Sequence, residues 1–185
     1  MRTARNLAPA GIAAVLALTI APAAQAQQMP QQTTATTVQA GWALHASAQD
    51  RAYLREAHRG NLAEIAAGKV ALGKSRDRDV RAIAARLIRD HRRLDARLRS
   101  VADRLDVRLP STPSAAQRDD LRAVAGRHGH RFDRAWLRLQ EDAHSHALWL
   151  GQRELRRGHS AWVKDLARDS APVIRHHLHA VRAEL

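Results

Sequence analysis

The sequence predicts an all-α protein built as an up-down-up-down four-helix bundle, and three observations lead to this fold class. The chain of 185 residues is 45% hydrophobic but only 3% aromatic, and it is rich in Ala, Leu and Arg. Such a composition favours helices over strands. Apolar residues recur at steps of three or four in four long segments, which is the spacing of one helix face. Two of the links between these segments are very short, as in antiparallel helix pairs.

The first 26 residues have the pattern of a secretory signal peptide. Two arginines precede an apolar stretch that is short for a membrane span, and Ala24-Gln25-Ala26 matches a signal-peptidase site. We expect cleavage after Ala26 and an exported protein, periplasmic or associated with the outer membrane; the alternative is an uncleaved amino-terminal anchor helix. Residues 27–46 are rich in Gln and Thr and have no apolar periodicity. They predict a disordered linker, which leaves residues 47–185 for the bundle.

The first two helices are predicted from their start signals and their apolar spacing. Ser47-Ala48-Gln49-Asp50 resembles a capping box and begins a helix over about 48–74. Its predicted inner face consists of Leu54, Ala57, Asn61, Ile65, Gly68 and Leu72. The helix over about 77–106 has the clearest face, with Val80, Ala84, Leu87, His91, Leu94, Leu98, Val101 and Leu105. A histidine therefore occupies one position of a bundle seam.

The third helix follows the one long connection, residues 107–116. Ser114 and Gln117 predict its start, and we expect it to kink near Gly126 and Gly129 before it continues to residue 157.

The fourth helix begins at Ser160, and His177 lies on its predicted seam. Pro172 should bend this helix without ending it. Because the first and second helices and the third and fourth are joined by short links, each pair should form an antiparallel hairpin, and the simplest packing is up-down-up-down.

Composition and motifs exclude several function classes. The chain has no Cys, which excludes disulfides, thiolate zinc sites and iron-sulfur clusters. It has no G-x-S-x-G, H-E-x-x-H or Gly-rich phosphate loop, so we expect no enzyme. The net charge of +13 falls to +11 when the two arginines of the first 26 residues are removed. A charge of this size favours polyanions and envelope surfaces through summed electrostatics, without specific recognition of nucleic acid.

One polar residue from each helix is predicted to reach a common level of the interior. His91 and His177 occupy seam positions, and helical projection turns His144 and Glu64 inward. If both short links lie at one end of the bundle, the four residues lie about 10 to 17 residues from that end, a spread of roughly 10 Å. Bundle interiors hold metal sites in this way. The alternative is that these residues are hydrogen-bonded core residues, with Glu64 in a buried ion pair.

Imidazoles with one carboxylate suit zinc, copper, nickel or iron better than calcium or magnesium. A carboxylate-bridged di-iron centre is disfavoured, because only Glu141 and His144 have the Glu-x-x-His spacing. The remaining histidines, notably His128, His130, His176 and His179, are expected to be exposed.

Four stretches of the chain are similar to the bacterial family called domain of unknown function 4142: DRAYLREAHRGNLAEIAAGKVAL, RDHRRLDARL, FDRAWLRLQEDAH and VIRHHL. The resemblance covers about residues 48–183. It implies a secreted or envelope-located bundle similar to the ferritin-like folds, and members are often described as outer membrane proteins. The recurring polar positions of the family match Glu64, Asp90, His91, His144 and His177 here.

Two functions follow as hypotheses. The first is an extracytoplasmic ferritin-like bundle, of unassigned physiological role, that binds one transition metal through Glu64, His91, His144 and His177, with Asp90 orienting a ligand. The second is a non-enzymatic envelope or stress protein whose basic surface contacts polyanions, its inner polar residues serving only the fold. The apolar patterning contains no membrane span after residue 26, and it leaves the oligomeric state open.

Overall fold

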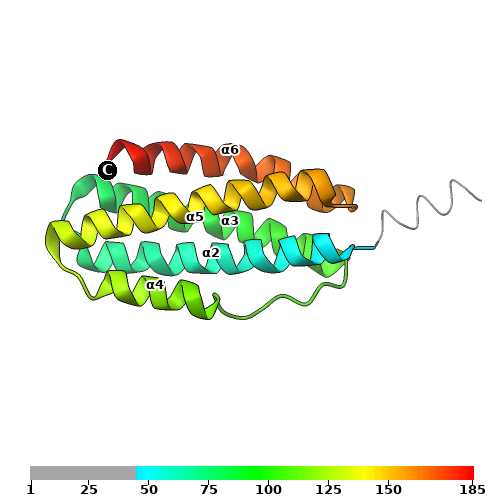
Figure 1. The fold of residues 1–185 in the computed structure, drawn as a ribbon, viewed down its shortest axis with the longest axis horizontal. Coiled ribbons are helices and arrows are strands. Elements are labelled where there is room, and N and C mark those ends of the chain that lie inside the picture. Colours follow the sequence, from blue (N-terminus) through cyan, green and yellow to red (C-terminus); the bar gives the residue numbers. More distant parts are fainter. Residues whose placement is uncertain (1–44) are drawn as a thin grey trace, which may run out of the picture. The chain divides into compact units, whose positions relative to one another are not determined.

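The computed structural model describes residues 45–185, so the predictions for residues 1–26 and for most of the linker lie outside the described residues. Within the described part there are five helices and no strand, which confirms the all-α prediction. They are α2 (Ala48–Lys74), α3 (Arg78–Arg104), α4 (Ala115–Ala125), α5 (Gly129–Arg157) and α6 (Ala161–Ala183) (Figure 1). The four long helices form the bundle, and the short α4 lies against α2 and α5.

Short polar side chains fix where three of the helices begin. Ser47 caps α2 with a full capping box, in which Ser47 and Asp50 each bond the other's backbone N–H. Ser114 and Gln117 form the same box at the start of α4. Asp77 accepts hydrogen bonds from two backbone N–H groups of α3. These caps satisfy backbone donors that have no partner inside the helix.

The directions of the helices differ from the up-down-up-down prediction. Hydrogen bonds join Gln49, at the start of α2, to Glu154, near the end of α5, and Ala67, late in α2, to Trp136, early in α5. Helices α2 and α5 are therefore antiparallel. The prediction had placed them parallel.

Side-chain bonds between α3 and α6 show the same reversal. Arg86, early in α3, contacts His176, late in α6, while Arg97, late in α3, contacts Asp169, early in α6. The bundle is thus up-down-down-up, and its two short links lie at opposite ends (Figure 1). The reason is that residues 105–114 and α4 carry the chain back along the bundle before α5 begins.

The predicted third helix is two helices. Helix α4 ends at Ala125, and α5 starts at Gly129 and runs back in the opposite sense (Figure 1). Gly129 has a φ of 55°, a left-handed conformation that glycine adopts without steric strain. The glycines that suggested a kink therefore make a turn. By contrast, Pro172 lies inside α6 without ending it, as predicted.

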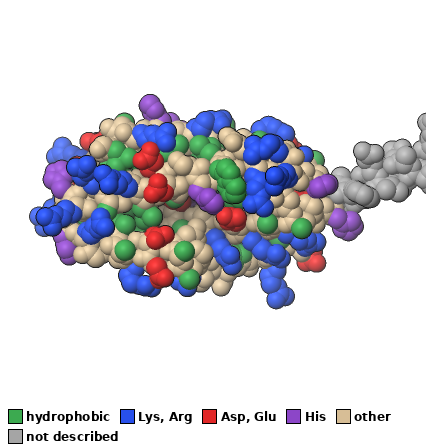
Figure 2. Space-filling view, viewed as in Figure 1, with side chains coloured by type: hydrophobic (Ala, Val, Ile, Leu, Met, Phe, Trp, Pro, Cys, Tyr) green, Lys and Arg blue, Asp and Glu red, His purple; other side chains and the backbone are tan. Residues whose placement is uncertain are grey.

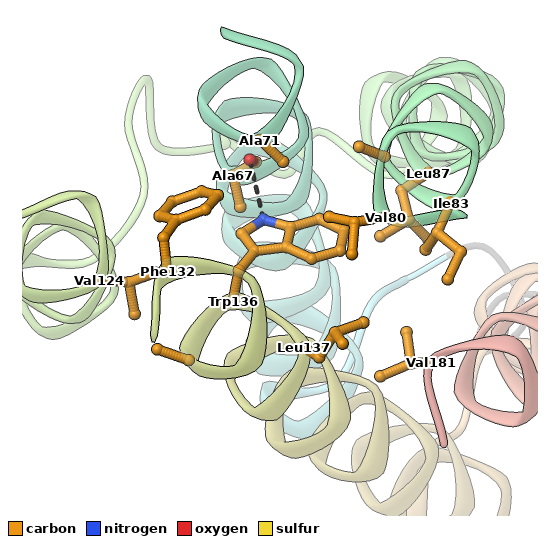
Figure 3. Close-up of a cluster of buried hydrophobic side chains, with 12 residues drawn as sticks. Ala67, Ala71, Val80, Ile83, Leu87, Val124, Phe132, Trp136, Leu137 and Val181 are labelled. Carbon is orange, nitrogen blue, oxygen red and sulfur yellow. Dashed lines mark hydrogen bonds between the residues drawn. The ribbon is translucent and has the colours of Figure 1, made fainter. Parts of the chain in front are cut away.

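Two clusters of buried apolar side chains fill the bundle. One surrounds Trp136, which is fully buried and whose indole N–H donates to the carbonyl oxygen of Ala67 at 3.0 Å (Figure 3). The other contains Leu54, Leu98 and Val163. The predicted inner face of α3 is buried almost throughout, whereas α2 buries a wider arc than predicted. The reason is that α2 contacts three other helices.

Two buried carboxyl groups tie the start of α2 to the link between α5 and α6. Asp50 accepts hydrogen bonds from the backbone N–H groups of His159 and Ser160 at 3.0 and 3.2 Å. Glu154 is fully buried, and its Oε2 accepts a bond from Gln49. Burial and the neighbouring Asp50 raise the pKa of Glu154 to about 7. The neutral acid is therefore the form that the fold favours.

We predict that replacing Gly68 destabilises the fold while replacing Gly60 does not. A Cβ on Gly68 would lie 2.6 Å from Cγ1 of Ile88 and 3.1 Å from the carbonyl oxygen of Ala84, whereas one on Gly60 would meet nothing within 4 Å. Gly68→Ala should lower the free energy of unfolding by about 1–3 kcal/mol. Gly60→Ala on the same helix should raise it by about 0.5–1 kcal/mol. Urea unfolding measures the free energy of unfolding of both variants. If the two substitutions raised it equally, the result would contradict the close approach of α2 and α3.

We predict that the titration of Glu154 lowers the free energy of unfolding as the pH rises. Its pKa is raised in the folded chain, so its contribution is complete below the ordinary value of 4.5 and is lost as the pH passes about 7. Relative to Glu154→Gln, which does not titrate, the wild type should become less stable between about pH 5 and pH 8. Urea midpoints of both proteins over this range give the difference, and a constant difference would be the contrary result.

Candidate metal centre

Three histidines from three helices converge in the middle of the bundle. His91 of α3, His144 of α5 and His177 of α6 are all buried. Their ring centroids form a nearly equilateral triangle with sides of 5.4, 5.4 and 5.5 Å. One nitrogen of each ring lies within 4.8 Å of the corresponding nitrogens of the other two. The three rings are thus close enough to share one ion.

The outer nitrogen of each ring faces a hydrogen-bond acceptor. His91 Nδ1 lies 2.9 Å from the amide oxygen of Asn61, and His144 Nδ1 lies 2.7 Å from the backbone oxygen of Gln140. His177 Nε2 lies 3.1 Å from a carboxylate oxygen of Asp90. Because these oxygens only accept, each outer nitrogen carries the ring proton. In the neutral rings the inner nitrogens therefore carry lone pairs.

The inner nitrogens have no donor to satisfy them. His91 Nε2 is buried without a hydrogen-bond partner. His144 Nε2 and His177 Nδ1 face each other at 3.4 Å, with a lone pair on each. Two ligand nitrogens about 2.05 Å from a tetrahedral zinc ion are about 3.4 Å apart, so this separation already fits a shared ion. The three inner nitrogens, which lie within 4.8 Å of one another, are therefore the atoms available to a shared cation.

Burial keeps the three imidazoles neutral. Burial, together with the neighbouring rings, holds the pKa of His91 well below its usual value. Burial lowers the pKa of His144 to about 4, although its bond to Gln140 acts in the opposite direction. Burial also lowers the pKa of His177, against the opposing effect of Asp90. Neutral imidazole is the form that binds metals.

Glu64 adjoins the three histidines from α2. Its Oε1 lies 3.9 Å from His144 Nδ1, on the side of that ring which bonds Gln140, and its Oε2 is buried without a hydrogen-bond partner. Burial raises the pKa of Glu64 to about 8. Glu64 is therefore an inward carboxyl group, as the sequence indicated, but it lies beside the histidine triangle.

A cavity of about 1050 Å³ reaches this centre. Residues from α2, α3, α4, α5 and α6 line it, and Glu64, His91, His144 and Ser170 are among them. His91 and His144 are therefore buried in the bundle but border this cleft, whereas His177 is not part of its lining.

The structure places the predicted polar residues as follows. His91, His144 and His177 come together with Glu64 at their edge, and Asp90 bonds His177 as expected of an orienting neighbour. The convergence survives the change of topology because Glu64, His91 and His144 lie near the middle of their helices, where the height is the same whichever way the helix runs. His177 lies 16 residues after the start of α6, as Glu64 lies 16 residues after the start of α2, and these two helices start at the same end of the bundle.

Sequence reasoning missed the buried pair of His58 and Asp95, whose Nδ1 and Oδ1 atoms are 2.6 Å apart. His58 does not fall on the predicted inner face of its helix and was among the histidines predicted to be exposed, and its burial shows that this prediction was wrong for His58. The bonding role of Asn61 was also missed, although the residue was placed on that face. His128, His130, His176 and His179 are exposed, as predicted.

A match to a family model shows to which protein family the chain belongs. Residues 19–183 match the family described as a domain of unknown function (DUF4142). The chain belongs to the DUF4142 family. This membership confirms the resemblance seen in the sequence, and no curated protein matches the chain.

Solved structures of another domain family share the fold of this DUF4142 protein. A DUF305 fragment from Deinococcus radiodurans has a TM-score of 0.67 at 16% identity, over 75% of this chain and 96% of that one. A DUF305 protein from Streptomyces coelicolor, described as a "putative secreted protein", has a TM-score of 0.62 at 12% identity, over 72% and 88% of the two chains. At these identities the likeness establishes the helical fold.

Among the described helices of the DUF4142 chain, none is both long enough and apolar enough to span a membrane.

Proposed function

We propose that this DUF4142 protein binds one transition-metal ion, zinc, copper, nickel or iron, through His91, His144 and His177. The observation that carries the proposal is the orientation of the three rings. Every outer nitrogen is bonded to an acceptor, so three lone pairs point inward from neutral imidazoles. Metal-binding histidines characteristically have this arrangement, since the outer bond fixes both the tautomer and the ring plane.

Glu64, which the sequence predicted as a fourth ligand, borders the proposed site. Its Oε1 lies 3.9 Å from the outer nitrogen of His144, and its Oε2 has no hydrogen-bond partner, so it adjoins the three ligand nitrogens without being one of the converging groups. Three imidazoles with a fourth oxygen ligand from a carboxylate or from solvent complete a tetrahedral sphere. The proposal concerns binding and includes no reaction.

We propose in addition that the protein acts outside the cytoplasm, in the periplasm or at the outer membrane. The signal-peptide pattern of residues 1–26 supports this location. The description of the Streptomyces coelicolor protein, which shares the fold, agrees with it.

We predict that removing His144 abolishes metal stabilisation and that removing His146 leaves it intact. His146 lies on the same helix but is exposed, and its Nε2 lies 2.8 Å from Oε1 of Glu56. In protein stripped of metal, an ion at about 100 times its Kd should raise the wild-type Tm by about 5–10 °C. His146→Ala should show the same rise and His144→Ala none, by calorimetry with each of the four metals.

His91→Ala serves as a second variant in case His144→Ala fails to fold, which circular dichroism without metal would show. A rise in Tm that persists in both folded variants, or the absence of any rise in the wild type, contradicts the proposed site.

We predict that Asp90→Asn weakens metal binding without removing a ligand. Asp90 accepts the outer N–H of His177, and this bond holds the ring with Nδ1 inward. Losing such a partner typically reduces metal affinity about 10- to 100-fold. Competition with a chromophoric chelator measures the affinity. Asp169→Asn is the matched control, because Asp169 pairs with Arg97 on the surface between the same two helices. Equal affinities for the two variants would show that Asp90 does not position His177.

A further inference from the structure

Four arginines border a hollow beside the start of α5. Arg127, Arg131, Arg134 and Arg138 line it together with Ala135, and its volume is about 400 Å³. The last three are spaced by three and four residues along α5, so they follow one face of the helix. Like charges at this spacing destabilise a helix slightly. The arrangement therefore favours an anionic partner.

The side chains of these four arginines form no hydrogen bond or ion pair with another residue of the part that the structure describes. Residues 1–44 contain no Asp or Glu, so the rest of the chain supplies no acid either. Other exposed arginines also lack an acidic partner, for example Arg92 and Arg93. The side chains of these four border a common hollow whose lining contains no acidic residue.

The hollow adjoins the large cleft of about 1050 Å³. Arg127, Ala135 and Arg138 line both spaces. Figure 2 shows Lys and Arg side chains over the end of the bundle where α4 leads into α5, with hydrophobic side chains next to them. The apolar side chains on the wall of the cleft include Leu94, Leu98, Leu121, Val124, Leu150 and Leu166, and the wall also contains His91 and His144. The four arginines therefore lie beside a space that is lined in part by apolar side chains.

The charges in the cleft itself decide where an anionic group would lie. Its wall carries the carboxyl groups of Glu56, Glu64, Asp120 and Asp142, besides Arg55 and Arg59 and the shared Arg127 and Arg138. An anion inside the cleft would meet these acids, whereas the arginine hollow has none. The charged end of a ligand should therefore lie in the hollow, and its uncharged part in the cleft.

We propose that this surface binds a single-chain amphiphile with a phosphate head group. Guanidinium groups bind phosphate oxygens in pairs, with charge-assisted hydrogen bonds. The apolar chain gains free energy by leaving water for the leucine-lined wall. A space of about 1050 Å³ is at the upper end of the volumes that hold small ligands. This proposal does not depend on the metal.

The test measures the binding of dodecyl phosphate, below its micelle concentration, to the full chain by isothermal titration calorimetry. Metal is stripped beforehand and the chelator removed by dialysis, so that phosphate cannot bind through an ion. Two further probes separate the parts of the ligand: inorganic phosphate has the head group alone, and dodecyl maltoside has the chain with an uncharged head. Because residues 1–44 are common to all variants, differences between variants report on the hollow and the cleft.

Two double variants and one single variant test the proposal. Arg131→Glu with Arg134→Glu reverses two charges of the hollow. Arg92→Glu with Arg93→Glu makes the same change in net charge on exposed residues of α3 outside both spaces. Ala147→Trp fills the cleft from α5, and Ala63→Trp fills it from α2 if the first does not fold.

We expect the hollow variant to weaken dodecyl phosphate binding about tenfold or more, since charge-assisted bonds are lost and repulsion is added. The α3 variant should stay within about twofold of the wild type, and the tryptophan variant should lose binding of dodecyl phosphate. Both inorganic phosphate and dodecyl maltoside should bind more weakly than dodecyl phosphate.

Three results would overturn the proposal. An equal loss in the two arginine variants would mean a response to net charge alone. Unchanged binding in the tryptophan variant would place the chain outside the cleft. If inorganic phosphate or dodecyl maltoside bound as tightly as dodecyl phosphate, the surface would recognise only the head group or only the apolar chain.

Discussion

The structure depends on three imidazole rings that form a polar layer between two apolar clusters. Along α3, His91 lies between Leu87 of the cluster around Trp136 and Leu98 of the other cluster. His144 and His177 occupy the corresponding places on α5 and α6. A buried polar atom without a partner costs about 1–3 kcal/mol. The outer nitrogens have their partners, whereas His91 Nε2 has none and the lone pairs of His144 Nε2 and His177 Nδ1 face each other.

The rest of the bundle supplies those outer partners. Helix α2 contributes Asn61, α3 contributes Asp90, and α5 contributes the backbone oxygen of Gln140. All four long helices must therefore be in register for the rings to keep their orientation. The close packing of α2 on α3 at Gly68 holds one part of this register. A metal ion would then stabilise an arrangement that the fold itself already holds in place.

The sequence predicted the helices and the inward histidines because both depend on local periodicity. His91 and His177 continue a seam of apolar residues, and His144 was separated from His146 by its direction on the helix. The path between α3 and α4 depends on tertiary packing, and no local signal showed that α4 would run back along the bundle. The up-down-up-down prediction failed there. His58 was missed for a related reason, because it is buried only through the wide arc of α2 that contacts three helices.

The claim that the three rings form a metal site is tested most directly by anomalous diffraction from crystals of the chain grown with zinc. We expect a single strong peak at the zinc edge about 2.0–2.1 Å from His91 Nε2, His144 Nε2 and His177 Nδ1. No peak at that point, or a peak only at exposed histidines such as His128 and His130, would contradict the account.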